Sequence, residues 1–195
     1  VAIAPYRVVE ADGLRVFHFP EDSAGAQGML QASLRAVEWL QELFGPLEGS
    51  LALNVMEIPN GWGSQASLAG GIIQEADALR DRNQIRKFYH ELSHLWNARD
   101  LDTPSPRWNE GLAMFLQDRM AIELDGWDGE IAALEQTKTR LLDKCGGNQR
   151  CSDVPLRNYG TEAMTDLSYS VGRMMFATLY NVLGEETFDR ALYGH

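Results

Sequence analysis

The sequence predicts an α+β fold in which strands and one long helix come first and a run of helices follows. Strand-like segments of alternating, β-branched and aromatic residues are found between residues 6 and 74. Apolar residues at helical spacing dominate from about residue 81 onward. A His-Glu-x-x-His motif at residues 90–94 lies where the two patterns meet. This order is typical of α+β domains and puts the motif helix at the junction.

The N-terminal part is predicted to form a mixed sheet with one long helix. Asp12-Gly13 separates the first two strand-like runs and is typical of a hairpin turn. Gly45-Pro46 is a helix stop signal. We expect strands over residues 6–10 and 14–19, a helix from residues 21–23 to Gly45, and strands over residues 51–58 and 67–74.

Gly70 and Gly71 fall inside the last of these predicted strands. Glycine weakens a strand, but it lets another backbone approach closely. Just ahead of the motif helix, the pair suggests an edge strand to which an extended substrate peptide could add. A simple β-bulge is an equally good interpretation of the same residues.

The C-terminal half is predicted to be mostly helical. We expect the motif helix over residues 81–98, a loop over 100–107, and helices over 108–116, 128–144, 166–183 and 185–193. Repeats, low-complexity tracts and interdomain linkers are not seen. We therefore expect one domain over residues 1–195, either a mature chain or a domain excised from a longer one.

Composition and charge exclude some classes of function. Of the 195 residues, 45% are hydrophobic and 23% charged, which is ordinary for a soluble globular protein. The net charge of −11 argues against nucleic-acid binding, which needs a basic surface. The sequence has no apolar run approaching the roughly twenty residues that span a bilayer, so we expect no transmembrane segment.

The two cysteines, Cys145 and Cys151, flank a short polar loop. A Gly-Gly-Asn segment within that loop bends easily, which favours a disulfide and a secreted or periplasmic protein. The alternative is two free thiols in a cytosolic protein.

The motif itself indicates a metal site. Positions i and i+4 of a helix share a face, so His90 and His94 point their imidazoles at one spot. Two neutral imidazoles at this spacing suit Zn²⁺, and Glu91 is placed to take a proton from zinc-bound water. Because only four histidines occur in the chain, a chance match to the pattern is improbable.

A catalytic zinc site needs a third protein ligand, and Glu110 is the best candidate. It lies near the start of the next helix, a short loop after the histidines. The alternative is a solvated glutamate in the first turn, where a negative charge is favourable. The spacing alone does not decide between the two.

Residues 90–96 (His-Glu-x-x-His-x-Trp) followed by 109–113 (Asn-Glu-Gly-Leu-Ala) resemble the gluzincin metallopeptidases. The two families that look most similar are the membrane-alanyl and glycyl aminopeptidases. In both, the Glu before Gly is the third zinc ligand, which implies that role for Glu110. The resemblance also implies a thermolysin-like metallopeptidase domain.

A further segment, Tyr-Ser-Val-Gly at residues 169–172, looks like the Tyr-x-Lys-Gly segment of the alanyl-type family. There the Tyr supplies a catalytic hydroxyl, which implies that role for Tyr169, with Tyr159 as the fallback. The Lys of that segment is Val171 here. The Gly-x-Met-Glu-Asn segment that grips the substrate's free amine is absent, since residues 66–73 contain no acidic side chain.

Taken together, these residues predict zinc-dependent hydrolysis of peptides or proteins. His90, His94 and Glu110 would hold zinc, Glu91 would act as the base and Tyr169 would bind the oxyanion. The alternative is a non-catalytic zinc-binding module that keeps a metallopeptidase fold for protein binding. A purely structural zinc site fits less well, because such sites are usually four-coordinate and rich in cysteine.

Overall fold

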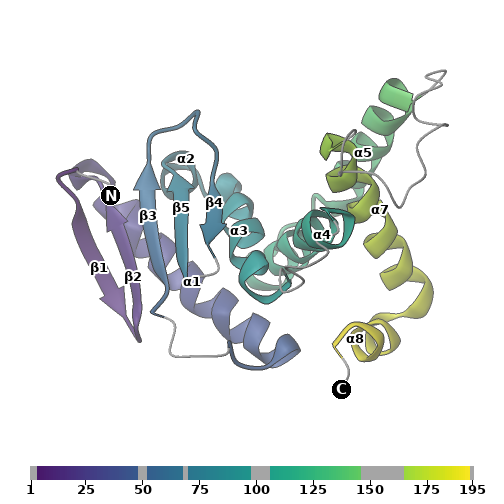
Figure 1. The fold of residues 1–195 in the computed structure, drawn as a ribbon, viewed down its shortest axis with the longest axis horizontal. Coiled ribbons are helices and arrows are strands. Elements are labelled where there is room, and N and C mark those ends of the chain that lie inside the picture. Colours follow the sequence, from purple (N-terminus) through teal and green to yellow (C-terminus); the bar gives the residue numbers. More distant parts are fainter. Residues whose placement is uncertain (1–3, 48–51, 68–69, 98–105, 146–164, 194–195) are drawn as a thin grey trace. The chain divides into compact units, whose positions relative to one another are not determined.

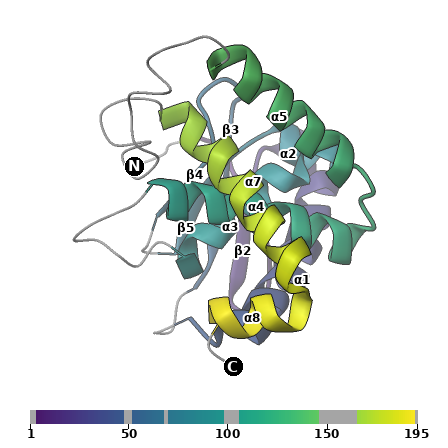
Figure 2. The ribbon, with the colours of Figure 1, turned by 90° about the vertical axis from the view of Figure 1, so that its right-hand side faces the viewer.

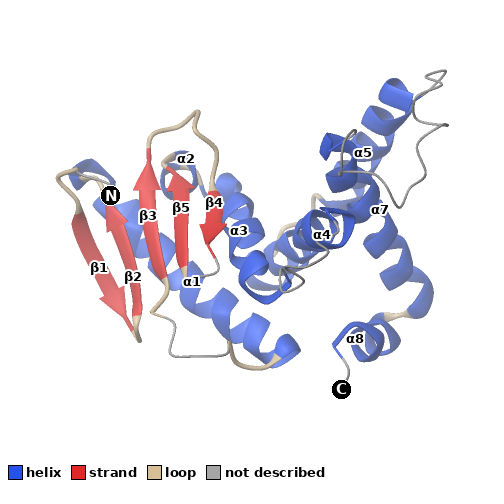
Figure 3. Ribbon diagram, viewed as in Figure 1, coloured by secondary structure: helices blue, strands red, loops and turns tan. Residues whose placement is uncertain are grey.

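The computed structural model of the protein describes residues 4–47, 52–67, 70–97, 106–145 and 165–193. Over these ranges the chain first forms a five-stranded sheet with helices and then helices alone (Figure 3). It divides into two compact units, Val1–Trp96 and Asn97–His195. The predicted order, a mixed sheet with a long helix followed by a mostly helical half, is confirmed.

Unit 1 is built on a mixed sheet whose strand order is β1-β2-β3-β5-β4 (Figure 1). The β1–β2 and β5–β4 pairs are antiparallel, and β2–β3 and β3–β5 are parallel. The elements are β1 (Arg7–Ala11), β2 (Leu14–His18), η1 (Pro20–Asp22), α1 (Ser23–Phe44), β3 (Asn54–Ile58), β4 (Gln65–Ser67), β5 (Gly71–Glu75), α2 (Asp77–Arg80), η2 (Arg82–Gln84) and α3 (Ile85–Asn97).

The first hairpin forms as predicted because its turn residues suit its geometry. Asp12 and Gly13 have φ angles of 50° and 79°. A type I′ turn requires positive φ at both central residues, and its backbone twist matches that of the two strands it joins. Ala11 therefore pairs directly with Leu14.

The long helix α1 lies along the sheet and ends where the sequence indicates. Gly45, with φ 77°, caps it by donating its N–H to the carbonyl of Gln41 at 2.9 Å. Small residues on the buried face of α1 let neighbouring elements approach closely. The buried residues of α1 are Ala26, Met29, Leu30, Ala32, Ser33, Ala36 and Leu40.

The single strand predicted over residues 67–74 is wrong. The structure has two strands, β4 and β5, which turn back on each other at Gly70. Gly70 has φ 82° and donates its N–H to Ser67 at 2.9 Å, a conformation that glycine adopts without strain. β5 pairs with β3 on one side and with β4 on the other, so the edge-strand position predicted for Gly70 and Gly71 is also wrong.

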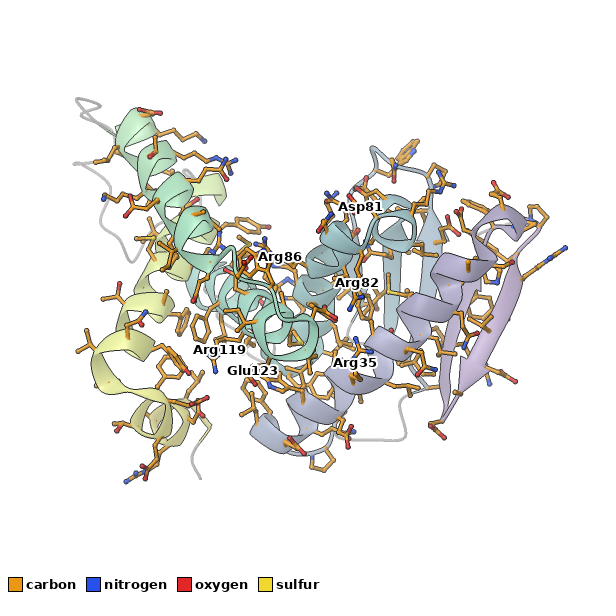
Figure 4. The ribbon with its side chains drawn as sticks, turned by 180° about the vertical axis from the view of Figure 1, so that it is seen from behind. Arg35, Asp81, Arg82, Arg86, Arg119 and Glu123 are labelled. Carbon is orange, nitrogen blue, oxygen red and sulfur yellow. The ribbon has the colours of Figure 1, made fainter. Side chains whose placement is uncertain are left out.

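The motif helix begins at Ile85 rather than at residue 81. Asp81, labelled in Figure 4, accepts a hydrogen bond from the N–H of Asn83 at 2.9 Å and so caps the short η2 turn instead. Asp and Asn side chains commonly hold turns in this way, because their oxygens reach the backbone two residues on. Residue 98, the predicted helix end, lies outside the described residues.

Unit 2 consists of helices over its described residues (Figure 2). They are α4 (Pro106–Asp125), α5 (Glu130–Cys145), α7 (Thr165–Leu183) and α8 (Glu185–Tyr193). Pro106 opens α4, two residues before the predicted start, and proline suits a first helical position because it lacks an N–H. The predicted helices over residues 128–144, 166–183 and 185–193 match α5, α7 and α8 closely.

An aromatic cluster joins three of the unit 2 helices. Phe115 of α4 lies 6.1 Å from Phe176 and 5.7 Å from Tyr180 of α7, measured between ring centroids. Phe188 of α8 is 5.2 Å from Phe115 and only 3% exposed. Burial of these aromatic rings against one another stabilises the packing of α8 on α4 and α7.

None of the helices in the described ranges is long and apolar enough to cross a membrane. Cys145 ends α5, whereas Cys151 and Tyr159 lie outside the described residues. The disulfide predicted from Cys145 and Cys151 therefore stays a prediction, and so does the location inferred from it.

Candidate functional site

Helix α3 presents the two motif histidines together. The Nε2 atoms of His90 and His94 lie 3.3 Å apart, and their rings meet edge to face with centroids 4.8 Å apart. His90 is 9% exposed and His94 is half-buried, as is Glu91 beside them. Two ring nitrogens therefore converge on one point at the boundary between core and solvent.

The opposite face of α3 is anchored in the core of unit 1. Phe88, Tyr89 and Leu92 are fully buried. Trp96 donates its indole N–H to the carbonyl of Gly45 at 3.0 Å and so ties the helix to the end of α1. The apolar residues recur every three or four positions, and this spacing fixes which face of α3 carries the histidines.

Lys87 holds the first turn of α3 to the neighbouring elements. Its ammonium group donates to Asp77 of α2 at 2.5 Å and lies 3.7 Å from the carboxylate of Glu75. The hydrogen bond to Asp77 raises the pKa of Lys87 above its ordinary value. Glu75 in turn accepts the N–H groups of Gly61, Trp62 and Gly63 at 2.6–3.0 Å, which orders the loop leading into β4.

Unit 2 carries the other two predicted site residues on helices that contact each other. Glu110 lies in the second turn of α4 and Tyr169 in the second turn of α7, and both are half-buried. Beside them the helices approach closely, since a Cβ atom built on Gly111 would lie 2.5 Å from the Cα of Gly172. Two glycines at the crossing point allow this approach.

Among the described residues, His90 and His94 of unit 1 and Glu110 of unit 2 are possible metal ligands. Each offers one ligand atom, a ring nitrogen from either histidine and a carboxylate oxygen from the glutamate. The histidine pair also passes a test of fit. Two nitrogens at about 2.05 Å from a tetrahedral zinc ion would be about 3.3 Å apart, which is the observed separation of the Nε2 atoms.

Comparison with solved structures identifies the fold. The chain superposes on native yeast LTA4 hydrolase with a TM-score of 0.70 at 14% sequence identity, covering 96% of this chain and 32% of the hydrolase. It superposes on a mutant M1 zinc metallopeptidase from Deinococcus radiodurans, bound to a Tyr-Ser-Ala substrate, with a TM-score of 0.61 at 19% identity, covering 97% of this chain and 43% of the metallopeptidase.

The chain has a gluzincin aminopeptidase-like fold. It spans about a third of the length of the yeast hydrolase and less than half of the bacterial metallopeptidase. No protein-family model and no curated protein sequence matches it. At 14–19% identity the likeness concerns the fold, and the activity has to be argued from the residues of this chain.

One polar pair in the gluzincin-like fold escaped the sequence analysis. Asp118 of α4 and Arg173 of α7 are 3% and 5% exposed, and the Nε of Arg173 donates to Asp118 at 2.6 Å. A usable signal was present, because Arg173 is the single charged residue in the otherwise apolar or small stretch over residues 170–179. A charge in such a position on a core helix is rarely left without a partner.

Proposed function

We propose that this chain is a zinc-dependent peptidase whose catalytic domain, of the thermolysin-like type, covers residues 1–195. The observation that carries the proposal is the 3.3 Å separation of the His90 and His94 Nε2 atoms on one helix, with Glu91 beside them. Histidines at i and i+4 with an adjacent glutamate combine a metal site with a general base. The gluzincin-like fold supports this interpretation.

His90, His94 and Glu110 are the proposed ligands. Two imidazoles and one carboxylate are a donor set that suits a catalytic zinc site with one position left open. Zinc at such a site lowers the pKa of water and polarises a carbonyl group. Anchoring of α3 through Trp96 and Lys87 keeps both imidazoles directed at the same point before metal arrives.

Glu91 is the proposed general base. Its carboxylate takes a proton from the attacking water and later gives that proton to the leaving amine of the cleaved peptide. Its backbone is held with that of the ligand pair, because Glu91 immediately follows His90 on the same helix. Its half-buried position gives it access to both water and substrate.

Tyr169 is the proposed oxyanion donor. Its hydroxyl donates a hydrogen bond to the negatively charged oxygen of the tetrahedral intermediate. The close crossing of α4 and α7 at Gly111 and Gly172 brings the second turns of both helices together, which supports a role for Tyr169 near Glu110. Tyr159 remains the alternative donor.

The substrate is proposed to be an extended peptide or protein segment bound along β4. This strand pairs with β5 on one side and is the outermost of the described strands at its end of the sheet. An extended peptide can add to such an edge through backbone hydrogen bonds. The loop before β4 is ordered by Glu75, which keeps the edge in place.

Metal analysis combined with a peptide-library cleavage assay tests the proposal. We expect about one zinc per chain. We also expect cleavage that stops when a chelator is added and returns when zinc is restored. Each library peptide is supplied with a free and with an acetylated N-terminus, so that the assay also reports whether a free amine is required. Zinc binding without cleavage of any peptide would instead favour the non-catalytic binding module.

We further propose a disulfide between Cys145 and Cys151 and a secreted or periplasmic protein. The bending of the intervening Gly-Gly-Asn segment supports the pairing. Alkylation without reductant, followed by mass spectrometry, tests it. If the disulfide is present, neither cysteine is alkylated. Alkylation of both cysteines would contradict the disulfide and the secreted or periplasmic location inferred from it.

A further inference from the structure

The contacts between α4 and α7 define a single register. Gly111 meets Gly172, Phe115 lies 6.1 Å from Phe176, and Arg119 lies with its Cζ 4.2 Å above the ring of Tyr180. From each of these contacts to the next, both helices advance by four residues. The two helices therefore run in the same sense and stay matched over more than two turns.

This register also determines how the two unit 2 site residues are spaced along the helices. Tyr169 comes three residues before Gly172, and Glu110 comes one residue before Gly111. Continuing the register by three residues toward the N-termini brings the backbone of Tyr169 alongside residue 108 of α4, two residues before Glu110. A slip of α7 by one turn would move Tyr169 by about 5.4 Å relative to Glu110.

The buried pair Asp118–Arg173 joins these helices with a directional contact. The Nε of Arg173 donates to Asp118 at 2.6 Å, and its Nη2 is also paired with the same carboxylate. Its Nη1 donates to the hydroxyl of Thr137 of α5 at 3.2 Å, and Gln117 donates to the other carboxylate oxygen of Asp118 at 3.3 Å. The guanidinium is thus held by two helices at once.

A pair of this kind contributes more to geometry than to stability. Burying two charges has a desolvation cost that roughly offsets their attraction, so an apolar pair of similar volume could stabilise the helices as well. Apolar contacts, however, allow one helix to shift slightly along the other. A planar guanidinium that donates to a carboxylate of α4 and to a hydroxyl of α5 has to satisfy two directions at once, which restricts its placement.

We propose that Asp118 and Arg173 are positioning residues that hold Tyr169 in place against the turn of α4 that carries Glu110. Arg173 follows Tyr169 by one helical turn, so fixing its guanidinium fixes the segment of α7 on which Tyr169 stands. This inference rests on the proposed function for the catalytic meaning of Tyr169. The placement of Tyr169 can be measured without any activity.

The first test is fluorine NMR of the full chain with 3-fluorotyrosine incorporated at position 169. We expect one sharp line that shifts or broadens in Arg173→Met, is largely restored in Arg173→Lys, and is unchanged in Arg190→Met. Arg190 is the matched control, because its ion pair with Glu186 lies on the exposed surface of α8. If Arg173→Met does not fold by circular dichroism, Asp118→Asn replaces it with the same expectation. The proposal would be overturned if the folded variant gave the same fluorine chemical shift and line width as the fluorotyrosine-labelled protein without the substitution.

The second test is a double-mutant cycle on peptide hydrolysis by the zinc-loaded chain. Displacing a catalytic group by about 1 Å can lower the rate on the order of 100-fold, so Arg173→Met should lower kcat by about 10- to 100-fold and leave KM within about two-fold. In a Tyr169→Phe background the same change should have an effect of less than about two-fold, because the hydroxyl to be positioned is gone. Equal loss of kcat in both backgrounds would contradict the positioning role. If the unmodified chain hydrolyses no peptide, the proposed function fails, and the fluorine spectrum still decides whether Arg173 places Tyr169.

Discussion

The Nε2 atoms of His90 and His94 lie 3.3 Å apart on one face of α3. This separation is what tetrahedral zinc requires of two imidazole ligands, and it is present in the protein chain alone. The geometry follows from local structure: the two histidines are four positions apart on one helix, and the buried face of α3 prevents the helix from rotating. The larger part of the proposed metal site therefore belongs to one element.

Replacement of His94 by alanine tests the ligand pair. Two remaining donors are too few for a stable zinc site, so we expect zinc to fall from about one per chain to near zero after dialysis. The control is His18→Asn, since His18 is a buried histidine that belongs to β2 and hydrogen-bonds the carbonyl of Phe19 at 2.7 Å. Zinc per chain is measured by elemental mass spectrometry. Full zinc content in His94→Ala would show that His94 is not a ligand.

Replacement of Tyr169 by phenylalanine tests the oxyanion donor. Loss of one such hydrogen bond typically lowers kcat on the order of 100- to 1,000-fold, while zinc content should stay the same. Tyr180→Phe is a matched control on the same helix, because its ring lies against Arg119 and keeps that contact without the hydroxyl. If Tyr169→Phe retains full kcat and Tyr159→Phe loses it, the role belongs to Tyr159.

Gly111→Ala should destabilise the chain. The added methyl group would lie 2.5 Å from the Cα of Gly172, and this backbone atom of a packed helix cannot yield easily. We expect the free energy of unfolding to fall by about 1–3 kcal/mol. Gly28→Ala in α1 meets no atom within 4 Å and should instead stabilise by about 0.5–1 kcal/mol. Urea denaturation of the two variants measures both signs, and a stabilised Gly111→Ala would show that α4 and α7 are not in close contact.

A buried carboxyl group in unit 1 should make stability depend on pH. Glu57 of β3 is fully buried, accepts the N–H of Phe19 at 2.7 Å, and lies 3.9 Å from Arg80. Burial raises its pKa from 4.5 to about 7. Asp22, which is paired with Arg80 at 2.6 Å, has its pKa lowered by that hydrogen bond.

The sign follows from proton binding. Between about pH 4.5 and 7 folded Glu57 keeps a proton that the unfolded chain releases, so the free energy of unfolding falls as the pH rises through this window, by about 2–3 kcal/mol. The lowered pKa of Asp22 acts only below about pH 4 and leaves the window unaffected. Urea denaturation at pH 5 and pH 7.5, with chelator present to remove metal effects, measures the difference. Glu57→Gln should flatten it and exposed Glu10→Gln should not; an unchanged slope in Glu57→Gln would contradict this account.

Much of unit 1 could be predicted from sequence because short-range signals decide it. Asp12-Gly13 dictates a tight hairpin turn, and Gly45 ends α1 in the expected place. The sequence over residues 67–74 predicts one strand, because its apolar residues are nearly continuous, whereas the structure has two. The reversal at Gly70 depends on a positive φ angle. Glycine permits such an angle, but the presence of a glycine does not predict it.

The candidate site divides in the same way. His90, Glu91 and His94 belong to one helical turn, so sequence spacing alone predicts their relation. The roles of Glu110 and Tyr169 depend on how α4 and α7 pack, and the spacing left Glu110 undecided. The Asp118–Arg173 pair joins residues 55 positions apart, and such pairings follow from tertiary packing rather than from local pattern.

Substitution of Glu91 by glutamine tests the central claim most directly. Glutamine keeps the size of the side chain but cannot accept the proton of the attacking water, and general base catalysis contributes about 10²–10⁴ to such rates. The measurement is kcat on a cleaved library peptide together with zinc per chain, with exposed Glu135→Gln as the control. The account predicts about one zinc per chain and a loss of at least about 100-fold in kcat. Undiminished hydrolysis by Glu91→Gln at full zinc content would contradict it.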